Sequence, residues 1–142
     1  MLKGIAKLIS PELMMTLMKM GHGDELVLAD ANFPADSHAQ RLVRADGLGA
    51  PAVLEAILPL FPLDTFVEDP VLVMRPVTDT ADEPEIWSEF RRLLAVESQA
   101  SVELQTLERF EFYERARQAY AIVATGESAL YANLILKKGV IP

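Results

Sequence analysis

A histidine flanked by two glycines is the most unusual feature of this sequence. His22 lies in the stretch Gly21-His22-Gly23-Asp24-Glu25, between an expected helix and an expected buried strand. Glycine on both sides leaves the backbone open, so that another group can approach the imidazole closely. Histidine is also the side chain best suited to proton transfer near neutral pH. The stretch is therefore typical of a proton-transferring histidine, and equally of a loop histidine beside two solvated acids.

A second candidate, Asp30, follows the apolar run Leu26–Ala29. Ligands of open α/β sheets bind beyond the carboxyl ends of strands, which makes a polar residue there a candidate ligand. The alternative role for Asp30 is to cap the loop that follows. A five-residue strand between His22 and Asp30 spans roughly 15 Å. Both side chains can therefore contact one small ligand only if the chain bends sharply or if neighbouring subunits complete the site.

Two later segments carry side chains that suit a polyol ligand. Arg109, expected at a strand end, could orient hydroxyl groups or stabilise an oxyanion. The pattern itself favours an ion pair of Arg109 with Glu108 or Glu111. Tyr131 and Asn133 both donate and accept hydrogen bonds, although a strand-edge tyrosine and a turn asparagine give the same pattern.

Several other charged and aromatic residues are predicted to have structural roles. Glu111 and Arg115 stand one helical turn apart and are predicted to pair. Phe110 and Phe112 are predicted to belong to the core, and His38 to be exposed in a polar loop.

Two residue clusters are also predicted to have structural roles. The methionines at positions 14, 15, 18 and 20 are predicted to fill the core. The acids from Asp64 to Glu89, where Arg75 is the lone base, indicate a solvated face and loop.

A metal site built from His22, Asp24, Asp30 and His38 is a further alternative. The chain has no cysteine and two histidines, which excludes thiolate zinc sites and histidine-rich centres. The four residues have no regular ligand spacing, so support for this alternative is weak. The sequence also lacks a phosphate loop, a dinucleotide fingerprint and a nucleophile elbow.

Turn and cap residues divide the chain into alternating strands and helices. Ser10-Pro11-Glu12 is typical of a helix start, with a cap, a proline at the first position and an acid at the positive helix end. Helices are expected from residue 11 and over 51–60, 84–95 and 112–120, and strands over 26–29, 42–44, 71–77, 102–107, 121–124 and 134–136. This alternation predicts an α/β fold with a central mixed sheet flanked by helices.

Length and charge limit the function further. The chain has 142 residues, 51% hydrophobic and 24% charged, which predicts a single domain over residues 1–142. A net charge of −8 argues against nucleic acid and anionic membranes as partners. No run approaches the ~18 apolar residues of a membrane span, and the start Met1-Leu2-Lys3-Gly4 lacks the order of a secretory signal. The cytoplasm is the expected compartment.

Several blocks of the sequence closely resemble the L-fucose mutarotase family, which is related to the D-ribose pyranases. The blocks are Met-Gly-His-Gly-Asp-Glu at 20–25, Leu-Ala-Asp-Ala-Asn-Phe-Pro at 28–34, Arg-Ala-Asp-Gly-Leu-Gly from 44, Leu-Phe-Pro-Leu-Asp from 60, Glu-Arg-Phe-Glu-Phe-Tyr-Glu-Arg-Ala from 108, Ala-Thr-Gly-Glu from 124 and Tyr131–Gly139. They follow one another in register over nearly the whole chain, with a weak match over 78–102. Long blocks in register are far more specific than a short motif.

The resemblance implies a ribose-pyranase-like α/β fold, assembled into a ring-like homo-oligomer that is a decamer in the family. It also implies active sites completed by a neighbouring subunit, and interconversion of sugar anomers without a metal or organic cofactor. The family's proton-transferring histidine falls on His22, its sugar-contacting aspartate on Asp30 and its arginine on Arg109.

The family's terminal Tyr-Gly-Asn segment falls on Tyr131, Ala132 and Asn133, which are expected to contact the sugar. Here alanine replaces the middle glycine. A methyl group at this position could crowd a sugar that is contacted through the backbone.

The function expected from the resemblance is mutarotation of L-fucose, with D-ribose, related aldoses and pyranose–furanose exchange also open. The anomeric hydroxyl loses a proton while the ring oxygen gains one, and the free aldehyde rotates before the ring closes again. We expect His22 to protonate the ring oxygen. Asp30 either accepts the anomeric proton or orients His22 and the sugar. A non-catalytic monosaccharide-binding protein with the same pocket is the alternative.

Overall fold

Six strands form one mixed sheet in the computed structural model, which describes residues 1–78, 82–98 and 101–142. The strands are β1 (Glu25–Ala29), β2 (Leu42–Ala45), β3 (Val71–Met74), β4 (Gln105–Leu107), β5 (Ala121–Thr125) and β6 (Leu134–Lys137). Their order across the sheet is β2-β5-β1-β6-β3-β4. β5 is parallel to β1 and β2, β4 is parallel to β3, and β6 runs antiparallel to β1 and β3. The predicted α/β fold class is confirmed.

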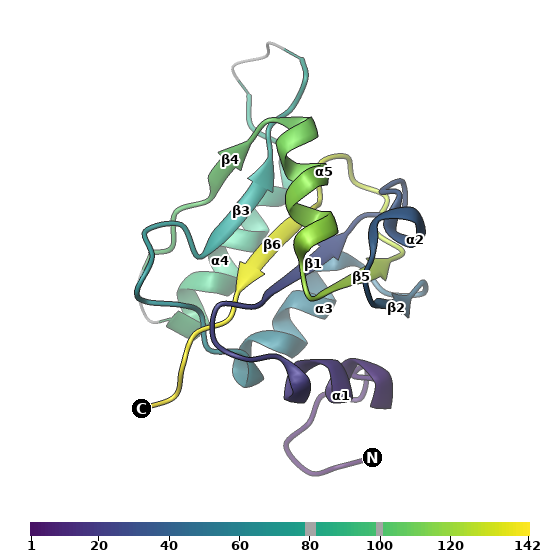
Figure 1. The fold of residues 1–142 in the computed structure, drawn as a ribbon, viewed down its shortest axis with the longest axis vertical. Coiled ribbons are helices and arrows are strands. Elements are labelled where there is room, and N and C mark those ends of the chain that lie inside the picture. The colour runs from purple at the N-terminus through teal and green to yellow at the C-terminus, as the bar shows by residue number, and fades with distance from the viewer. Residues whose placement is uncertain (79–81, 99–100) are drawn as a thin grey trace.

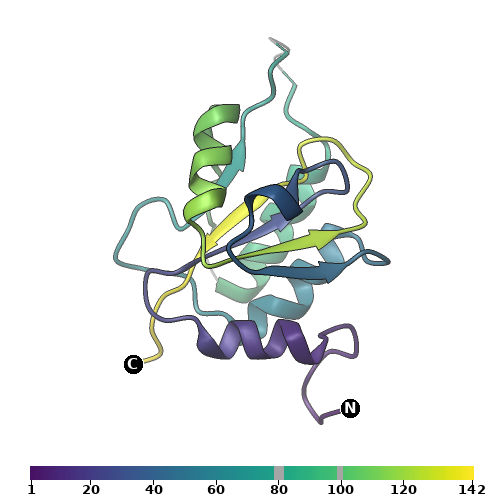
Figure 2. The same cartoon turned by 45° about the vertical axis from the view of Figure 1, so that its right-hand side comes forward.

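Helices cover both faces of this sheet. One face packs against α1 (Pro11–Lys19), α3 (Ala50–Ile57) with the short 3-10 helix η1 (Leu58–Leu60), and α4 (Ile86–Ser98). The other face packs against α2 (Ala35–His38) and α5 (Arg109–Gln118). Figure 1 shows α5 in front of the sheet and α3 and α4 behind it, and Figure 2 shows the sheet between these layers from the side. None of the described helices is both long and apolar enough to cross a bilayer.

The central strands are continuous apolar runs because neither face of the sheet meets water. In β1, Leu26 and Leu28 join the core beneath α1, α3 and α4, whereas Val27 and Ala29 join the core beneath α2 and α5. All residues of β1, β3 and β5 are buried. This burial on both faces explains why short apolar runs predicted these strands correctly.

The ends of α1 are fixed by side chains far apart in the sequence. Ser10 accepts a hydrogen bond from the Leu13 N–H at 3.1 Å, which confirms the predicted helix start. At the other end, the Lys138 ammonium donates to the carbonyl oxygens of Leu17 and Met20, at 2.8 and 2.7 Å. A cation at a helix carboxyl end is favourable, and this one fixes the chain just before the His22 loop.

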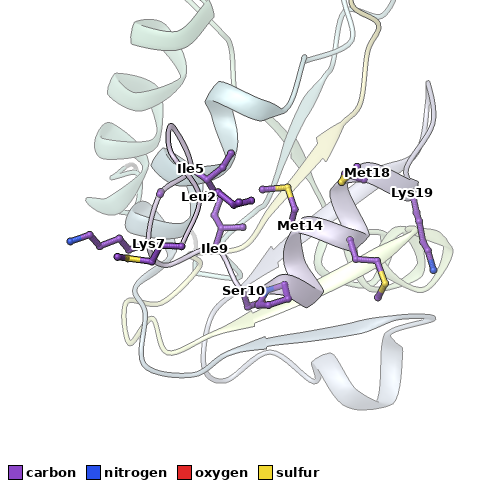
Figure 3. A pocket seen from close by; sticks show the side chains of 12 residues that line it. Leu2, Ile5, Lys7, Ile9, Ser10, Met14, Met18 and Lys19 are labelled. Carbon is purple, nitrogen blue, oxygen red and sulfur yellow. The ribbon is translucent and has the colours of Figure 1, made fainter.

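The prediction that the methionines of α1 fill the core is wrong for two of them. Met20 is buried, but Met15 and Met18 are 51% and 78% exposed. The inward face of α1 carries Leu13 and residues one turn further on, so positions 15 and 18 face outward. Both methionines line an apolar cavity of about 670 Å³. Figure 3 shows this cavity at the outer side of α1, beside the N-terminal segment.

Several element boundaries differ from the prediction. β4 begins at Gln105 instead of residue 102, and α4 ends at Ser98 instead of residue 95. β3 ends at Met74 instead of residue 77, since Pro76 has no N–H to donate to the sheet. α5 begins at Arg109, three residues before the predicted start. The reason is a capping box, in which the Glu108 carboxylate accepts from the backbone of the first turn and the Glu111 carboxylate accepts from the Glu108 N–H. The short helix α2 also differs from the prediction, which expects a loop at these residues.

Arg115 pairs with Glu25 of β1, so the predicted pair with Glu111 is wrong. The Arg115 guanidinium donates to this carboxylate from Nη2 at 2.6 Å and from Nε to its two oxygens at 2.8 and 3.1 Å. Glu111 is occupied by the cap of its own helix. The ion pair ties α5 to the start of β1, next to the His22 loop.

Candidate active site

The carboxyl ends of β1, β3 and β4 meet at one edge of the sheet, together with the amino end of β6. Asp30 directly follows β1, Arg109 follows β4 as the first residue of α5, and Asn133 directly precedes β6. With Tyr131 and Met74 among others, these side chains line a cavity of about 210 Å³. This volume lies below the range of about 300–1,000 Å³ typical for drug-sized ligands and suits a small polar molecule. The structure thus brings together four of the residues that the sequence indicated.

A closed pair of hydrogen bonds joins Asp30 to Asn133. The Asp30 N–H donates to Asn133 Oδ1 at 2.8 Å, and Asn133 Nδ2 donates to Asp30 Oδ2 at 2.8 Å. The Asn32 N–H donates to the other carboxylate oxygen at 3.0 Å, so Asp30 also caps the following loop. Burial nevertheless raises the pKa of the Asp30 carboxyl above its ordinary value, because desolvation outweighs these bonds. Such a carboxylate takes up a proton more readily than one in water.

Arg109 offers an unused donor at this cavity. Its guanidinium lies over the Phe110 ring, with Cζ 4.6 Å from the ring centre. Its Nε is buried and has no hydrogen-bond partner in the described part of the chain. The predicted ion pair with Glu108 or Glu111 is wrong. Both carboxylates accept hydrogen bonds in the capping box instead. A buried donor without a partner beside a polar cavity fits a ligand oxygen.

The two phenylalanines of this segment differ. Phe112 is fully buried, as predicted, but Phe110 is 61% exposed. In a helix, residues two apart point to different sides, so both could not enter the same core.

Tyr131 adopts a left-handed backbone conformation, with φ 59°. Its hydroxyl accepts a hydrogen bond from the Val77 N–H at 3.3 Å. Its carbonyl oxygen accepts one from Trp87 Nε1 at 3.0 Å. The side chain therefore lines the cavity while the carbonyl bonds to α4.

His22 lies at the opposite end of β1. The Gly23 N–H donates to the Lys138 carbonyl at 2.8 Å, which ties this loop to the end of β6. His22 Nε2 lies 3.3 Å from Asp64 Oδ1, and the imidazole is 47% exposed. The Phe66 ring is centred 5.6 Å from the imidazole. The histidine is thus accessible but held on one side.

Asp64 orients His22 and was missed by the sequence analysis. The side chain is 4% exposed, unlike the solvated acids of the segment to which it was assigned. The Phe66 N–H donates to Oδ1 at 3.0 Å, and this bond, assisted by His22, holds the pKa of the Asp64 carboxyl below its ordinary value. A carboxylate on one imidazole nitrogen fixes the ring and leaves the other nitrogen for proton exchange. The available signal was the apolar run directly before Asp64, a pattern shared with Asp30.

The two groups of residues stay apart within one chain. β1 is a regular strand paired with β5 on one side and β6 on the other, so no sharp bend brings His22 to Asp30. His22 is absent from the cavity lining formed by the described residues. Within one chain, His22 and Asp30 therefore do not line the same cavity.

Comparison with known proteins assigns the fold to a family. The model of the RbsD / FucU transport protein family matches residues 3–141. The chain belongs to this family. It is 54% identical over 146 residues to fucose mutarotase from Mus musculus, with 99% of this chain and 95% of the mouse protein aligned. The predicted resemblance is confirmed.

Solved structures of the RbsD/FucU family agree. The crystal structure of fucose mutarotase in complex with L-fucose from Streptococcus pneumoniae is 50% identical to this chain, with a TM-score of 0.94 over 99% of this chain and 100% of that one. Bacillus subtilis RbsD, complexed with D-ribose, is 23% identical with a TM-score of 0.74 over the full length of both chains, a likeness of fold alone. The predicted ribose-pyranase-like fold is confirmed.

The alanine that replaces the glycine of the family motif is accommodated away from the cavity. Ala132 is fully buried and belongs to the core on the α1, α3 and α4 side. Tyr131 and Asn133, on either side of it, line the cavity. The backbone of Ala132 contributes a hydrogen bond that lowers the pKa of Asp30, opposing the effect of burial. The methyl group therefore does not crowd the cavity as the sequence had suggested.

The alternative of a metal site is not formed within the described ranges. No group of three or more histidine, aspartate or glutamate side chains there could hold a metal ion. His38 is partly buried rather than exposed as predicted, and its ring packs against Phe33 and Tyr113, with centres 5.9 and 5.3 Å apart. His22 and Asp30 lie at opposite ends of the sheet.

Proposed function

We propose that this protein is an L-fucose mutarotase, an isomerase that interconverts the α and β anomers of the free sugar. The observation that carries the proposal is the cavity at the carboxyl edge of the sheet. It combines the desolvated Asp30 carboxylate with the unpaired Arg109 donor and the Tyr131 hydroxyl. A protein half identical to this chain has been solved with L-fucose.

Ring opening moves two protons. The Asp30 carboxylate accepts the proton of the anomeric hydroxyl, the bond between the anomeric carbon and the ring oxygen breaks, and His22 donates a proton to that oxygen. The aldehyde then rotates, and the ring closes on its other face as each proton returns. Arg109 donates to an oxygen that carries partial negative charge. Asn133, whose amide is paired with Asp30, holds this base in place, and Tyr131 contacts another hydroxyl.

The same proposal includes self-association into a ring-like homo-oligomer, with a decamer expected from the family resemblance. In that assembly the His22–Asp64 pair of one subunit completes the Asp30 cavity of the next. The support is the separation of the two groups along β1. The cytoplasm stays the compartment predicted from the sequence.

Saturation-transfer NMR of the anomeric protons tests the activity. Mutarotation has no net product, so exchange between the anomers at equilibrium is the direct signal. We expect the protein to accelerate exchange of L-fucose, with D-ribose measured alongside. Binding of L-fucose without faster exchange would leave a monosaccharide-binding protein, and faster exchange of D-ribose alone would identify a different substrate.

A further inference from the structure

Trp87 is the single tryptophan of the chain and lies outside the cavity, in the first turn of α4. It is 2% exposed. Its indole N–H donates a hydrogen bond of 3.0 Å to the carbonyl oxygen of Tyr131. A buried residue of one helix thus bonds directly to the backbone of a residue that lines the cavity.

The backbone that accepts this bond is strained. Among the described residues, Tyr131 is the one non-glycine residue with a positive φ. A side chain makes this conformation unfavourable, so neighbouring contacts must hold it in place. Tyr131 lines the cavity, and within the described part its hydroxyl has one hydrogen bond, from the Val77 N–H at 3.3 Å. The position of this hydroxyl therefore depends on the backbone behind it.

The segment from Tyr131 to Asn133 is held at two points. Asn133 is held by its hydrogen-bond pair with Asp30, and Tyr131 by Trp87. Ala132 between them is fully buried. Loss of the Trp87 bond leaves a carbonyl without its partner and allows the left-handed turn to relax, which moves the Tyr131 hydroxyl.

We propose that Trp87 is a positioning residue for the sugar site. Its indole N–H fixes the left-handed turn at Tyr131 and so places the tyrosine hydroxyl against the sugar. The inference rests on the proposed function in one respect, namely that L-fucose binds in the cavity that Tyr131 lines.

The test is calorimetric titration of L-fucose into wild type and into Trp87→Phe, at a temperature where both are folded. Phenylalanine keeps an aromatic ring in the core and removes the N–H. We expect the Kd to rise by about tenfold, the factor that corresponds to one lost buried hydrogen bond. Phe90→Leu is the matched control, because Phe90 is a fully buried aromatic of the same helix, packed in the core on the face opposite α5. It should lower the melting temperature and leave the Kd unchanged.

An unchanged Kd in Trp87→Phe, or an equal rise in Phe90→Leu, would overturn the inference. If Trp87→Phe does not fold, the inference is tested on the wild type by NMR, through the single indole N–H resonance. It should shift when L-fucose saturates the protein, and a resonance that stays in place would reject the role. A wild type that does not bind L-fucose at all would instead contradict the proposed function.

Discussion

Asp30 shows how one residue can be well bonded and still be poised to accept a proton. Its carboxylate receives hydrogen bonds from Asn133 and the Asn32 backbone, yet the cost of burial is larger and raises its pKa. The same two partners hold it at the cavity wall. The same environment thus fixes the position of the Asp30 carboxylate and raises its pKa.

This environment predicts an acid limb in the activity. A base works only when ionised, and a raised pKa means that Asp30 takes up its proton above the ordinary value of 3.8. The rate of L-fucose exchange should therefore fall as the pH drops through a midpoint above 3.8. The measurement is exchange against pH, with circular dichroism as the control for folding. A rate that stays flat down to the ordinary value would contradict the assignment of Asp30 as the base.

The sequence revealed these residues individually but not their partners. Asp30 was found because it ends an apolar run, and His22 because glycines flank it. The contact between His22 and Asp64 joins residues 42 positions apart, so no local pattern predicts it. Asp64 was instead grouped with solvated acids. For the same reason the neighbours of Arg109 in the sequence gave a wrong ion pair.

At the scale of elements, the turn after β5 depends on a close approach of two backbones. A Cβ built on Gly126 would lie 1.9 Å from the carbonyl oxygen of Asp46, in the turn after β2. The Gly126 N–H donates to the nearby Leu48 carbonyl at 2.8 Å. The two turns therefore cannot separate without losing this bond.

Gly126→Ala should accordingly lower the free energy of unfolding by about 3 kcal/mol, the upper range for a group forced into a packed site. Gly47→Ala is the matched control, since a Cβ there meets nothing within 4 Å. It should change stability by no more than about 0.5 kcal/mol. Denaturant unfolding of both variants measures the difference, and equal stabilities would show that the turns do not pack as described.

The ion pair between α5 and β1 gives a second prediction at this scale. Arg115→Met leaves the carboxylate of Glu25, which is 8% exposed, with Lys137 at 3.7 Å as its remaining cation. We expect a loss of about 2–3 kcal/mol, somewhat below the usual cost of breaking a buried pair because the arginine is partly exposed. Arg117→Met removes the exposed pair with Glu114 and should cost at most about 1 kcal/mol. Similar unfolding curves for the two variants would contradict this account.

Helices and strands were predicted correctly where a cap residue or an apolar run in the sequence determines them. The cap at Ser10 and the apolar runs of β1 and β5 gave the right element types. The start of α5 was placed too late because a glutamate cap is a weaker signal than serine and proline. The outward methionines of α1 were misassigned because the apolar pattern does not say which stripe of a short helix faces the sheet.

At the scale of the whole molecule, the strand order determines where the site lies. The antiparallel insertion of β6 between β1 and β3 brings Asn133 beside Asp30 and places Lys138 beside the His22 loop. No segment of the sequence encodes this order by itself, since it arises from pairing between distant strands. The Asp30 cavity and the His22–Asp64 pair therefore lie at opposite ends of β1, a full strand length apart.

This arrangement makes the exchange of L-fucose anomers in mixed oligomers the most direct measurement. His22→Ala and Asp30→Ala, expressed separately, should each lose about 10²- to 10⁴-fold in rate, the contribution of a positioned acid or base. Co-expressed in equal amounts, the two variants should regain about a quarter of the wild-type rate, because that share of sites pairs an intact His22 with an intact Asp30 across a subunit boundary. Mixed oligomers as inactive as the separate variants, or a folded single variant with full activity, would contradict a mutarotase site shared between subunits.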